Sequence, residues 1–182
     1  MNSVVETDRL ILREWRADDL PAFAQLNADP QVMQFMPKLL DRDQSNAVAE
    51  KIELHFNQHG FGLWAVEIPG IAQFAGFVGL SVPDFDARFT PCVEIGWRIA
   101  HSYWNQGYAT QAAEAVASYG FSTLNLTEIV SFTVSDNLAS RRVMEKLRMT
   151  HDPADDFDHP LLNAGRPLSR HVLYRLTPPT TS

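Results

Sequence analysis

The stretch from Cys92 to Gly120 constrains the fold of this chain most, because it places a strand, a glycine turn and a helix in direct succession. Residues 92–100 are largely apolar and predict a strand. The turn that follows is Trp104-Asn105-Gln106-Gly107-Tyr108-Ala109-Thr110. Behind it, small residues recur at the spacing of one helix face: Ala109, Ala112, Ala113, Val116, Ala117 and Gly120. Such a stripe buries little area per residue but lets the helix lie close to whatever it covers.

The glycine turn has the features of a phosphate-binding site. The first N–H groups of a helix have no partner within it, and the macrodipole adds about half a positive charge there. Gly107 can adopt a positive φ and has no Cβ to keep an anion from the backbone. The chain contains neither G-x-x-x-x-G-K-[ST] nor G-x-G-x-x-G after a strand, which argues against a P-loop or a Rossmann site. A plain strand-to-helix turn is the alternative interpretation.

Charge and composition exclude several functional classes. The net charge of −7 argues against a nucleic-acid partner, which favours a basic face. The single cysteine, Cys92, excludes an internal disulfide and fits a reducing compartment, and its apolar neighbours favour a packed thiol over a nucleophile. The six histidines are too scattered for a metal site, so we expect no metal. With no run near 18 apolar residues and no signal-like N-terminus, we expect a cytoplasmic protein with no membrane partner.

The remaining patterns predict one domain over residues 1–182, with its core at about 6–176. Strands are expected at 9–14, 63–68, 74–82, 92–100, 128–134 and 170–176. Helices are expected from Asp18 or Asp19 to Asn27, over 42–58, after Gly107, and from Asp136 or Asn137 to Leu147. Residues 83–91 and 152–168 are predicted to be loops, and 177–182 a loose tail. Interleaved strands and helices, with three strands in a row, predict an α/β fold with a mixed sheet and helices on both faces.

Three motifs together resemble the acetyl-CoA signature of the GNAT superfamily of N-acetyltransferases. They are Glu94-Ile95-Gly96-Trp97-Arg98-Ile99, the turn from Trp104 to Thr110, and Asn137-Leu138-Ala139-Ser140. The opening Glu6-Thr7-Asp8-Arg9-Leu10-Ile11-Leu12-Arg13 is typical of the branch that includes the ribosomal-protein N-terminal (alanine and serine) acetyltransferases. The resemblance implies a mostly antiparallel sheet in which two parallel strands, equivalent to 92–100 and 128–134, splay apart around the cofactor.

The resemblance also implies roles for individual residues. The backbone of Trp97, Arg98, Ile99 and Ala100 would pair with pantetheine as an added strand does. The pyrophosphate would lie in the turn formed by Asn105, Gln106, Gly107, Tyr108, Ala109 and Thr110. Asn137 would hydrogen-bond the pantetheine arm, and Ser140 would lie near the sulfur. Asn137 as a mere helix cap and Ser140 as an ordinary first-turn serine are the alternatives.

Acetyl transfer to an amine needs a base more than it needs an acid, because the thiolate is a fairly good leaving group. Glu94 alternates with Gly96 and Arg98 along the strand, so these three residues share one face. A carboxylate in an apolar strand is paired, exposed or functional. Glu94 is therefore the candidate base, acting through water, and a structural pair with a nearby arginine is the alternative.

The chain departs from the family pattern at three places: the adjacent pair Trp104 and Asn105, then Met144, then Arg148. Trp104 stands where many relatives have a basic residue or glutamine, and Asn105 replaces a frequent glycine. Met144 stands where many relatives carry the tyrosine taken as the general acid, so that role would pass to Ser140, to water, or to nothing. Arg148 occupies the usual glycine after the helix, where a positive φ would cost on the order of 1 kcal/mol.

The sequence thus predicts an acetyl-CoA-dependent N-acetyltransferase that acts on a primary amine. A protein N-terminal α-amine is the closest implied acceptor. The alternatives are a small amine of the aminoglycoside or polyamine kind, and a non-catalytic acyl-CoA-binding module, which only Met144 favours. The acidic stretch 152–168 would suit a cationic acceptor, with a solvated charge run as the alternative. The oligomeric state stays open, with a homodimer as one option.

Overall fold

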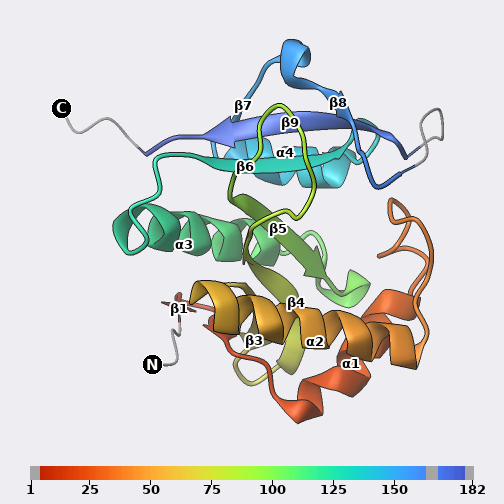
Figure 1. The fold of residues 1–182 in the computed structure, drawn as a ribbon. Helices are drawn as coiled ribbons and strands as arrows, with labels where there is room; N and C mark the ends of the chain where they lie inside the picture. The colour runs from red at the N-terminus through yellow and green to blue at the C-terminus, as the bar shows by residue number, and fades with distance from the viewer. Residues whose placement is uncertain (1–4, 163–167, 179–182) are drawn as a thin grey trace.

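A computed structural model describes residues 5–162 and 168–178 and shows a single nine-stranded sheet (Figure 1). The strand order is β1-β2-β3-β4-β5-β6-β9-β7, with β8 paired to β9. The strands are β1 (Val5–Glu6), β2 (Ile11–Arg13), β3 (Leu63–Ile68), β4 (Ala72–Ser81), β5 (Glu94–Ile99), β6 (Ile129–Val134), β7 (Thr150–His151), β8 (Phe157–Asp158) and β9 (Arg170–Leu176). The helices are α1 (Leu20–Ala28), α2 (Arg42–His59), α3 (Tyr108–Ser122) and α4 (Leu138–Lys146), with 3-10 turns η1 (Ala17–Asp19), η2 (His101–Tyr103) and η3 (Pro153–Asp155).

The sheet is mixed, as predicted. Every described strand pair is antiparallel except β5 with β6. Short turns join β3 to β4, whereas the parallel pair is joined through α3, which is the crossover that parallel strands require. None of the helices that the structure describes combines the length and apolarity that a bilayer crossing requires.

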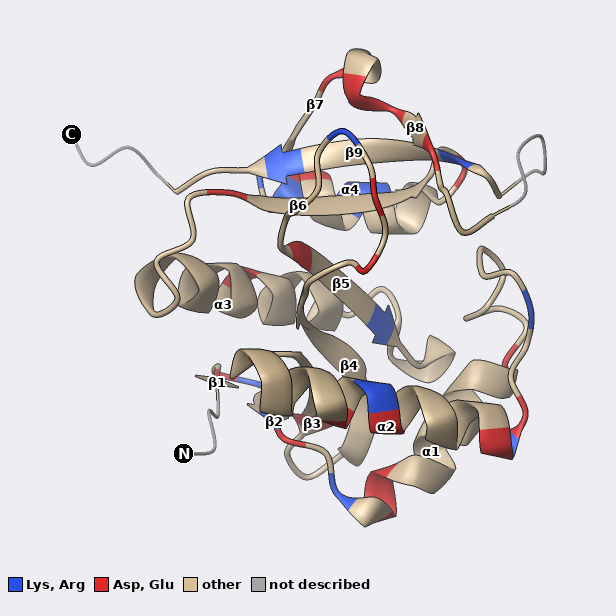
Figure 2. Ribbon diagram, viewed as in Figure 1, with Lys and Arg blue, Asp and Glu red and all other residues tan. Residues whose placement is uncertain are grey.

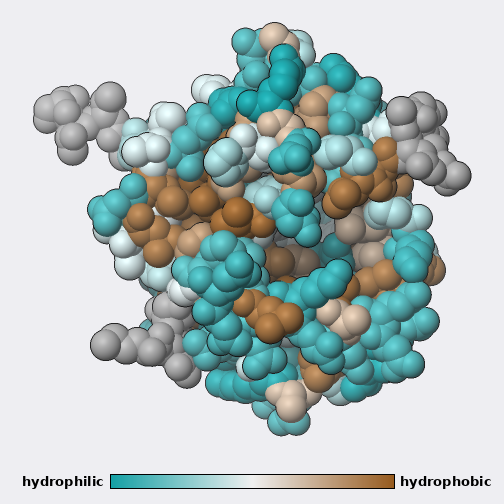
Figure 3. Space-filling view, viewed as in Figure 1, coloured by the Kyte–Doolittle hydropathy of each residue, from teal (hydrophilic) through white to brown (hydrophobic). Residues whose placement is uncertain are grey.

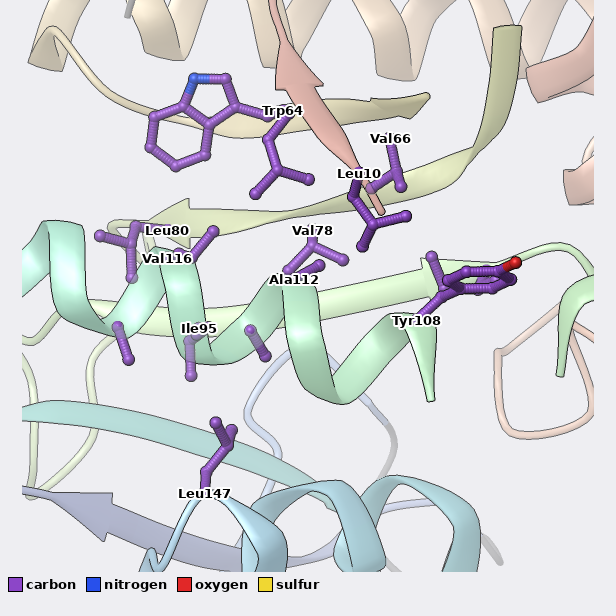
Figure 4. Packing of buried hydrophobic residues seen from close by; sticks show 14 of the residues in the cluster. Leu10, Trp64, Val66, Val78, Leu80, Ile95, Tyr108, Ala112, Val116 and Leu147 are labelled. Carbon is purple, nitrogen blue, oxygen red and sulfur yellow. The ribbon is translucent and has the colours of Figure 1, made fainter. Parts of the chain in front are cut away.

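Helices cover both faces of the sheet. On one face, α3 and α4 pack with one side of β2, β3, β4 and β5 in the largest core cluster. Figure 4 shows Ala112 and Val116 of α3 among Val78, Leu80 and Ile95 of the sheet. The small-residue stripe predicted from the sequence is buried there, apart from Ala109, which is half-buried. Its small side chains allow this close approach of helix to sheet.

The opposite face has two different coverings. Phe23 and Leu26 of α1 and Ile52 of α2 pack against Phe77 of β4 in a second cluster. Over the β6–β9 half, an aromatic cluster takes the place of helices: Phe85, Phe89, Phe132 and Phe157 lie within 4.7–6.4 Å of one another, ring centre to ring centre. The predicted loop 83–91 is thus held to the sheet by its phenylalanines.

A buried ion cluster fixes the N-terminal segment. The Arg13 guanidinium makes two hydrogen bonds of 2.8 Å to the Asp19 carboxylate and one of 2.7 Å to Glu67. The side chains of Arg13 and Asp19 are 5% and 3% exposed. The hydrogen bonds that Arg13 donates to Asp19 and Glu67 raise the pKa of Arg13, although burial opposes the shift. The cluster ties β2 to β3 and to the start of α1.

One sequence prediction on secondary structure needs correction. Residues 152–168 were expected to be loop, but η3 and β8 lie within them, and the two-residue strand β7 precedes them. β7 and β8 are strands because they form hydrogen-bonded pairs with β9, and the local sequence pattern does not reveal this pairing. Residues 163–167 of that stretch, and most of the expected tail at 177–182, lie outside the described residues.

Candidate active site

The parallel strands β5 and β6 pair at one position only, Glu94 with Val130. Two further bonds join this point: Val130 N–H donates to the Val93 carbonyl, and the Ser131 hydroxyl donates to the Ile95 carbonyl, both at 2.9 Å. Beyond Ile95, β5 has β4 as its hydrogen-bonded neighbour but no paired residue on β6. The β6-facing edge of β5 is therefore open to an extended ligand that adds as a strand. Trp97 to Ala100 lie on or just after this edge.

Gly76 of β4 allows a close approach to β5 on the side of β5 opposite β6. Its φ is 142°, and a Cβ at this position would collide with the Arg98 carbonyl oxygen and lie 2.8 Å from Ile99 Cα. The edge itself ends at Trp104, whose indole N–H donates to the Ile99 carbonyl at 2.7 Å. One lone pair of that carbonyl is thus already used, which leaves Trp97 and Arg98 as the freer part of the predicted pairing segment.

The glycine turn has the conformation that the sequence predicted. Gly107 has a φ of 82° and precedes α3, and Asn105, which stands for a frequent glycine, has a φ of 59°. No side chain caps the start of α3, and its first turn contains no acidic residue. The backbone N–H groups of Tyr108, Ala109 and Thr110 are therefore the ones that a bound anion could take.

Arg9 is a functional candidate that sequence reasoning missed. Its guanidinium donates to the Gln106 carbonyl at 3.1 Å and to the Gln111 side chain at 2.8 Å, and its Cζ lies 4.9 Å from the centre of the Tyr108 ring. A cation at the positive end of a helix is unfavourable unless an anion joins it. About 100 residues separate Arg9 from the turn, so only the resemblance of its N-terminal motif pointed to this segment.

The remaining turn residues contribute backbone more than side chain. Tyr108 is 7% exposed and its ring packs in the core. Gln106 uses its side-chain amide to donate to the Ser102 carbonyl at 3.3 Å. Ala109 and Thr110 are half-buried in the first turn of α3.

Asn137 and Ser140 begin α4 beside β6. The Asn137 amide oxygen accepts from Ser140 N–H at 3.2 Å, and its nitrogen donates to the Thr133 hydroxyl at 3.0 Å. The helix-cap interpretation of Asn137 is therefore correct, and one amide N–H remains for a ligand. Ser140 is half-buried, and its N–H serves the cap.

Glu94 lies at the start of β5 on the face predicted for it. Val93, Ile95 and Trp97 pack in the core under α3, so Glu94, Gly96 and Arg98 face the other way. Among the described residues, Glu94 forms no ion pair, and the Ser81 hydroxyl at 3.5 Å is its hydrogen-bond partner. Burial raises the pKa of Glu94 to about 8, and the Ser81 bond weakly opposes this shift.

The surface is hollowed over β5. Figure 2 shows an acidic segment at one end of this strand and a basic segment at the other, and Figure 3 shows a recess there between the α1–α2 half and the β6–β9 half. Glu94 keeps some contact with solvent although protein surrounds it on most sides. A largely buried carboxyl whose pKa is raised to about 8 can exchange protons near neutral pH.

The positions that depart from the family pattern are resolved as follows. Met144 is 1% exposed and fills the core, so it offers no proton. Arg148 has a φ of 60°, the conformation that favours glycine.

Cys92 packs beside the aromatic cluster, where burial raises the pKa of its thiol to about 11, so it is no thiolate.

The carboxylates of the acidic stretch have partners within the protein. Asp155 pairs with Arg175 at 2.8 Å, Asp156 with His151 at 2.8 Å, and Asp158 with Arg170 at 3.8 Å. Asp152 accepts from the Ala154 N–H in the first turn of η3. These carboxylates therefore give little reason to expect attraction of a cationic acceptor.

Comparison with known proteins gives consistent matches. Residues 9–150 match the sequence model described as an acetyltransferase (GNAT) domain. The uncharacterized N-acetyltransferase YnaD of Bacillus subtilis is 28% identical over 149 residues, covering 81% of this chain and 83% of YnaD. The FsC-acetyl coenzyme A-N(2)-transacetylase of Aspergillus fumigatus is 31% identical over 138 residues, covering 70% of this chain and 56% of that protein.

A solved structure of RimL, a ribosomal α-N-protein acetyltransferase in complex with coenzyme A, matches 96% of this chain and 98% of its own. The TM-score is 0.74 and the sequence identity is 16%. At this identity the likeness shows a shared fold.

Proposed function

This chain belongs to the GNAT acetyltransferase family, and we propose that it transfers an acetyl group from acetyl-CoA to a primary amine, with the α-amine of a protein N-terminus as acceptor. The observation that carries the proposal is the open edge of β5 leading directly into the uncapped start of α3. An extended arm with amide groups can pair along the edge, and a pyrophosphate can end at the turn. Arg9 supplies a positive charge beside that turn.

Glu94 and Ser140 are the side chains to which the chemical work is assigned. The α-ammonium of a peptide N-terminus has a pKa of about 8, so part of the acceptor must lose a proton before the amine attacks. Glu94, with its raised pKa, takes that proton through a water molecule. The amine nitrogen then forms its bond to the thioester carbonyl carbon, and the carbon–sulfur bond breaks. Ser140 is the residue proposed to donate a hydrogen bond to the departing sulfur, since Met144 cannot.

A thermal-shift experiment tests the cofactor site. Acetyl-CoA and desulfo-CoA should both raise the melting temperature, and adenosine alone should not. Gly107→Asp places a carboxylate where the phosphates belong and should abolish the shift.

Gly70→Asp is the matched control. Gly70 also has a positive φ, 74°, with nothing within 4 Å of a Cβ, so the same substitution imposes the same backbone strain far from the turn. It should leave the acetyl-CoA shift intact. A folded Gly107→Asp protein with the full shift would disprove the assignment.

A second experiment identifies the acceptor. Release of free thiol from acetyl-CoA is measured with a panel of N-terminal peptides, polyamines and aminoglycosides. The name of the FsC N(2)-transacetylase gives an N(2) position of FsC as the acceptor, whereas that of RimL gives the α-amine of a ribosomal protein. Turnover of the small amines alone would therefore favour the small-molecule alternative. Acetyl-CoA binding without any turnover would favour a non-catalytic module.

A further inference from the structure

Arg98 is a recess-facing cation whose guanidinium is held by neutral groups. Its Nη1 donates to the Asn27 amide oxygen at 2.6 Å, and its Nη2 lies 3.5 Å from the Met36 sulfur. Its Cζ lies 5.2 Å from the centre of the Phe77 ring. Asn27 is fully buried, and its amide nitrogen donates to the buried Ser45 hydroxyl at 3.2 Å, so the guanidinium is fixed from behind by α1 and α2.

Arg98 lacks the counter-charge that the other well-held arginines possess. Arg13 and Arg175 each pair with two carboxylates. Within residues 5–162 and 168–178, none of the carboxylates forms an ion pair with Arg98. Burial lowers the pKa of Arg98 to about 10, so the group is still charged at neutral pH. A guanidinium has five N–H donors in a fork that fits two oxygens of one anion, and two neutral partners do not use them all.

The floor between Arg98 and Glu94 is open. The residue between them on this face is Gly96, where a Cβ would touch nothing nearer than a Glu94 carboxylate oxygen at 3.9 Å. Four steps along the strand separate the two Cα atoms by about 13 Å, part of which the two side chains fill. A molecule with its amine at Glu94 must therefore extend several ångströms along β5 to reach Arg98.

We propose that Arg98 binds a carboxylate of the acceptor, so that the substrate is an amine carrying a negative charge several ångströms from its reacting nitrogen. This inference rests on the proposed function and specifies its substrate class. The amine and carboxylate of a free α-amino acid are too close together to reach both residues. An N-terminal peptide with Asp or Glu at its second or third position has the required reach, since an extended chain advances about 3.3 Å per residue. The net charge of −7 gives no long-range attraction to such a peptide, so its selection depends on this local cation.

The test compares peptides that differ only in this charge. Peptides that begin with serine and carry Asp, Asn or Lys at the second or third position are assayed for acetylation. The wild-type protein should favour the best Asp peptide over its Asn counterpart by about ten- to a hundredfold in kcat/KM, mostly through KM, the range for a hydrogen bond to a charged group. Arg98→Gln should bring the ratio between the two peptides close to one. Arg98→Lys keeps the charge without the fork and should retain part of the preference.

Two results would overturn the inference. One is an equal kcat/KM of the wild-type protein for the Asp and Asn peptides. This result does not depend on whether any variant folds. The other is a preference for Asp that persists in folded Arg98→Gln.

A binding measurement separates this inference from the proposed function. With desulfo-CoA present, the Asp peptide should raise the melting temperature of the wild-type protein more than the Asn peptide does, and Arg98→Gln should remove the difference. If no peptide is acetylated but this difference appears, the anion site stands and the proposed reaction is wrong. If peptides are acetylated without regard to charge, the reaction stands and the anion site is wrong.

Discussion

Replacement of Glu94 by glutamine tests the proposed base, and the structure sets the size of the effect. Burial raises the pKa of this carboxyl to about 8. At pH 7 only about one-tenth of the molecules then carry the ionised base, because each pH unit below the pKa is a factor of ten. The contribution of Glu94 to kcat/KM should therefore rise about tenfold between pH 7 and pH 9.

The comparison with Glu94→Gln should change with pH in a characteristic way. General-base catalysis contributes about 10²-fold at the lower end of its range, which suits a relay through water. The loss should thus be about tenfold at pH 7 and should grow as Glu94 ionises near pH 8. At higher pH the gap should stop growing and then narrow, because solvent deprotonates a peptide α-amine, whose pKa is about 8.

The assay is thiol release from saturating acetyl-CoA, with kcat/KM for the acceptor measured from pH 6 to pH 10.5. Glutamine resembles the protonated carboxyl that the folded protein holds at pH 7, so the acetyl-CoA thermal shift should persist. Glu114→Gln, an exposed change on α3, is the control and should leave the profile unaltered. A loss that is constant across the pH range would refute the assignment of Glu94 as the base.

The same shift has a consequence for stability. The pKa of Glu94 is higher in the folded state than its ordinary value of 4.5. Its contribution to the free energy of unfolding is thus complete below about pH 4.5 and is lost as the pH rises through about 8. Between pH 5 and pH 9, Glu94→Gln should therefore gain stability relative to the wild-type protein.

Three further predictions concern other parts of the molecule. Ser140→Ala should lower kcat by less than Glu94→Gln does, and the loss should not recover at high pH, because Ser140 would act on the departing sulfur; equal recovery in both variants would contradict separate roles. Asp19→Ala should lower the free energy of unfolding by about 3–5 kcal/mol in urea denaturation, since it leaves the buried Arg13 charge without its main partner. Asp158→Ala, which removes an exposed pair, should cost about 0–1 kcal/mol and serves as its control. Burial lowers the pKa of both His159 and His171, whose ring centres lie 5.1 Å apart, so their contribution to stability is present above about pH 6.5 and falls as the solution is acidified. The melting temperature should accordingly drop less between pH 7 and pH 5 in the double variant His159→Gln/His171→Gln than in the wild-type protein, and an equal drop would assign the acid sensitivity elsewhere.

The strand–turn–helix unit was predictable from the sequence because its signals are local. The stripe from Ala109 to Gly120, the glycine before α3 and the alternation along β5 each depend on residues a few positions apart. They placed Gly107 at a positive φ and Glu94 on the face away from α3, as the structure has them. Arg148 likewise has the positive φ that its position after a helix suggested.

What the sequence could not predict depends on contacts between distant segments. Arg9 reaches the glycine turn, and Arg98 meets Asn27, over 97 and 71 positions of sequence separation. The raised pKa of Glu94 arises from burial by several elements together. The partners of Asp155, Asp156 and Asp158 were hidden for a similar reason, because Arg170 and Arg175 lie on the distant strand β9.

Because β5 and β6 pair at a single position, the sheet is held together less strongly between these two strands than between its other strands. Backbone hydrogen bonds cross this seam only near Val93 and Val130, and the shared core under α3 and α4 supplies most of the remaining cohesion among the described residues. Few backbone hydrogen bonds therefore join the β1–β5 half of the sheet to the β6–β9 half. A ligand bound along the open edge of β5 would add contacts between the two halves where the protein has no paired residues. Occupancy of the recess and rigidity of the whole sheet are therefore linked by the geometry of one strand pair.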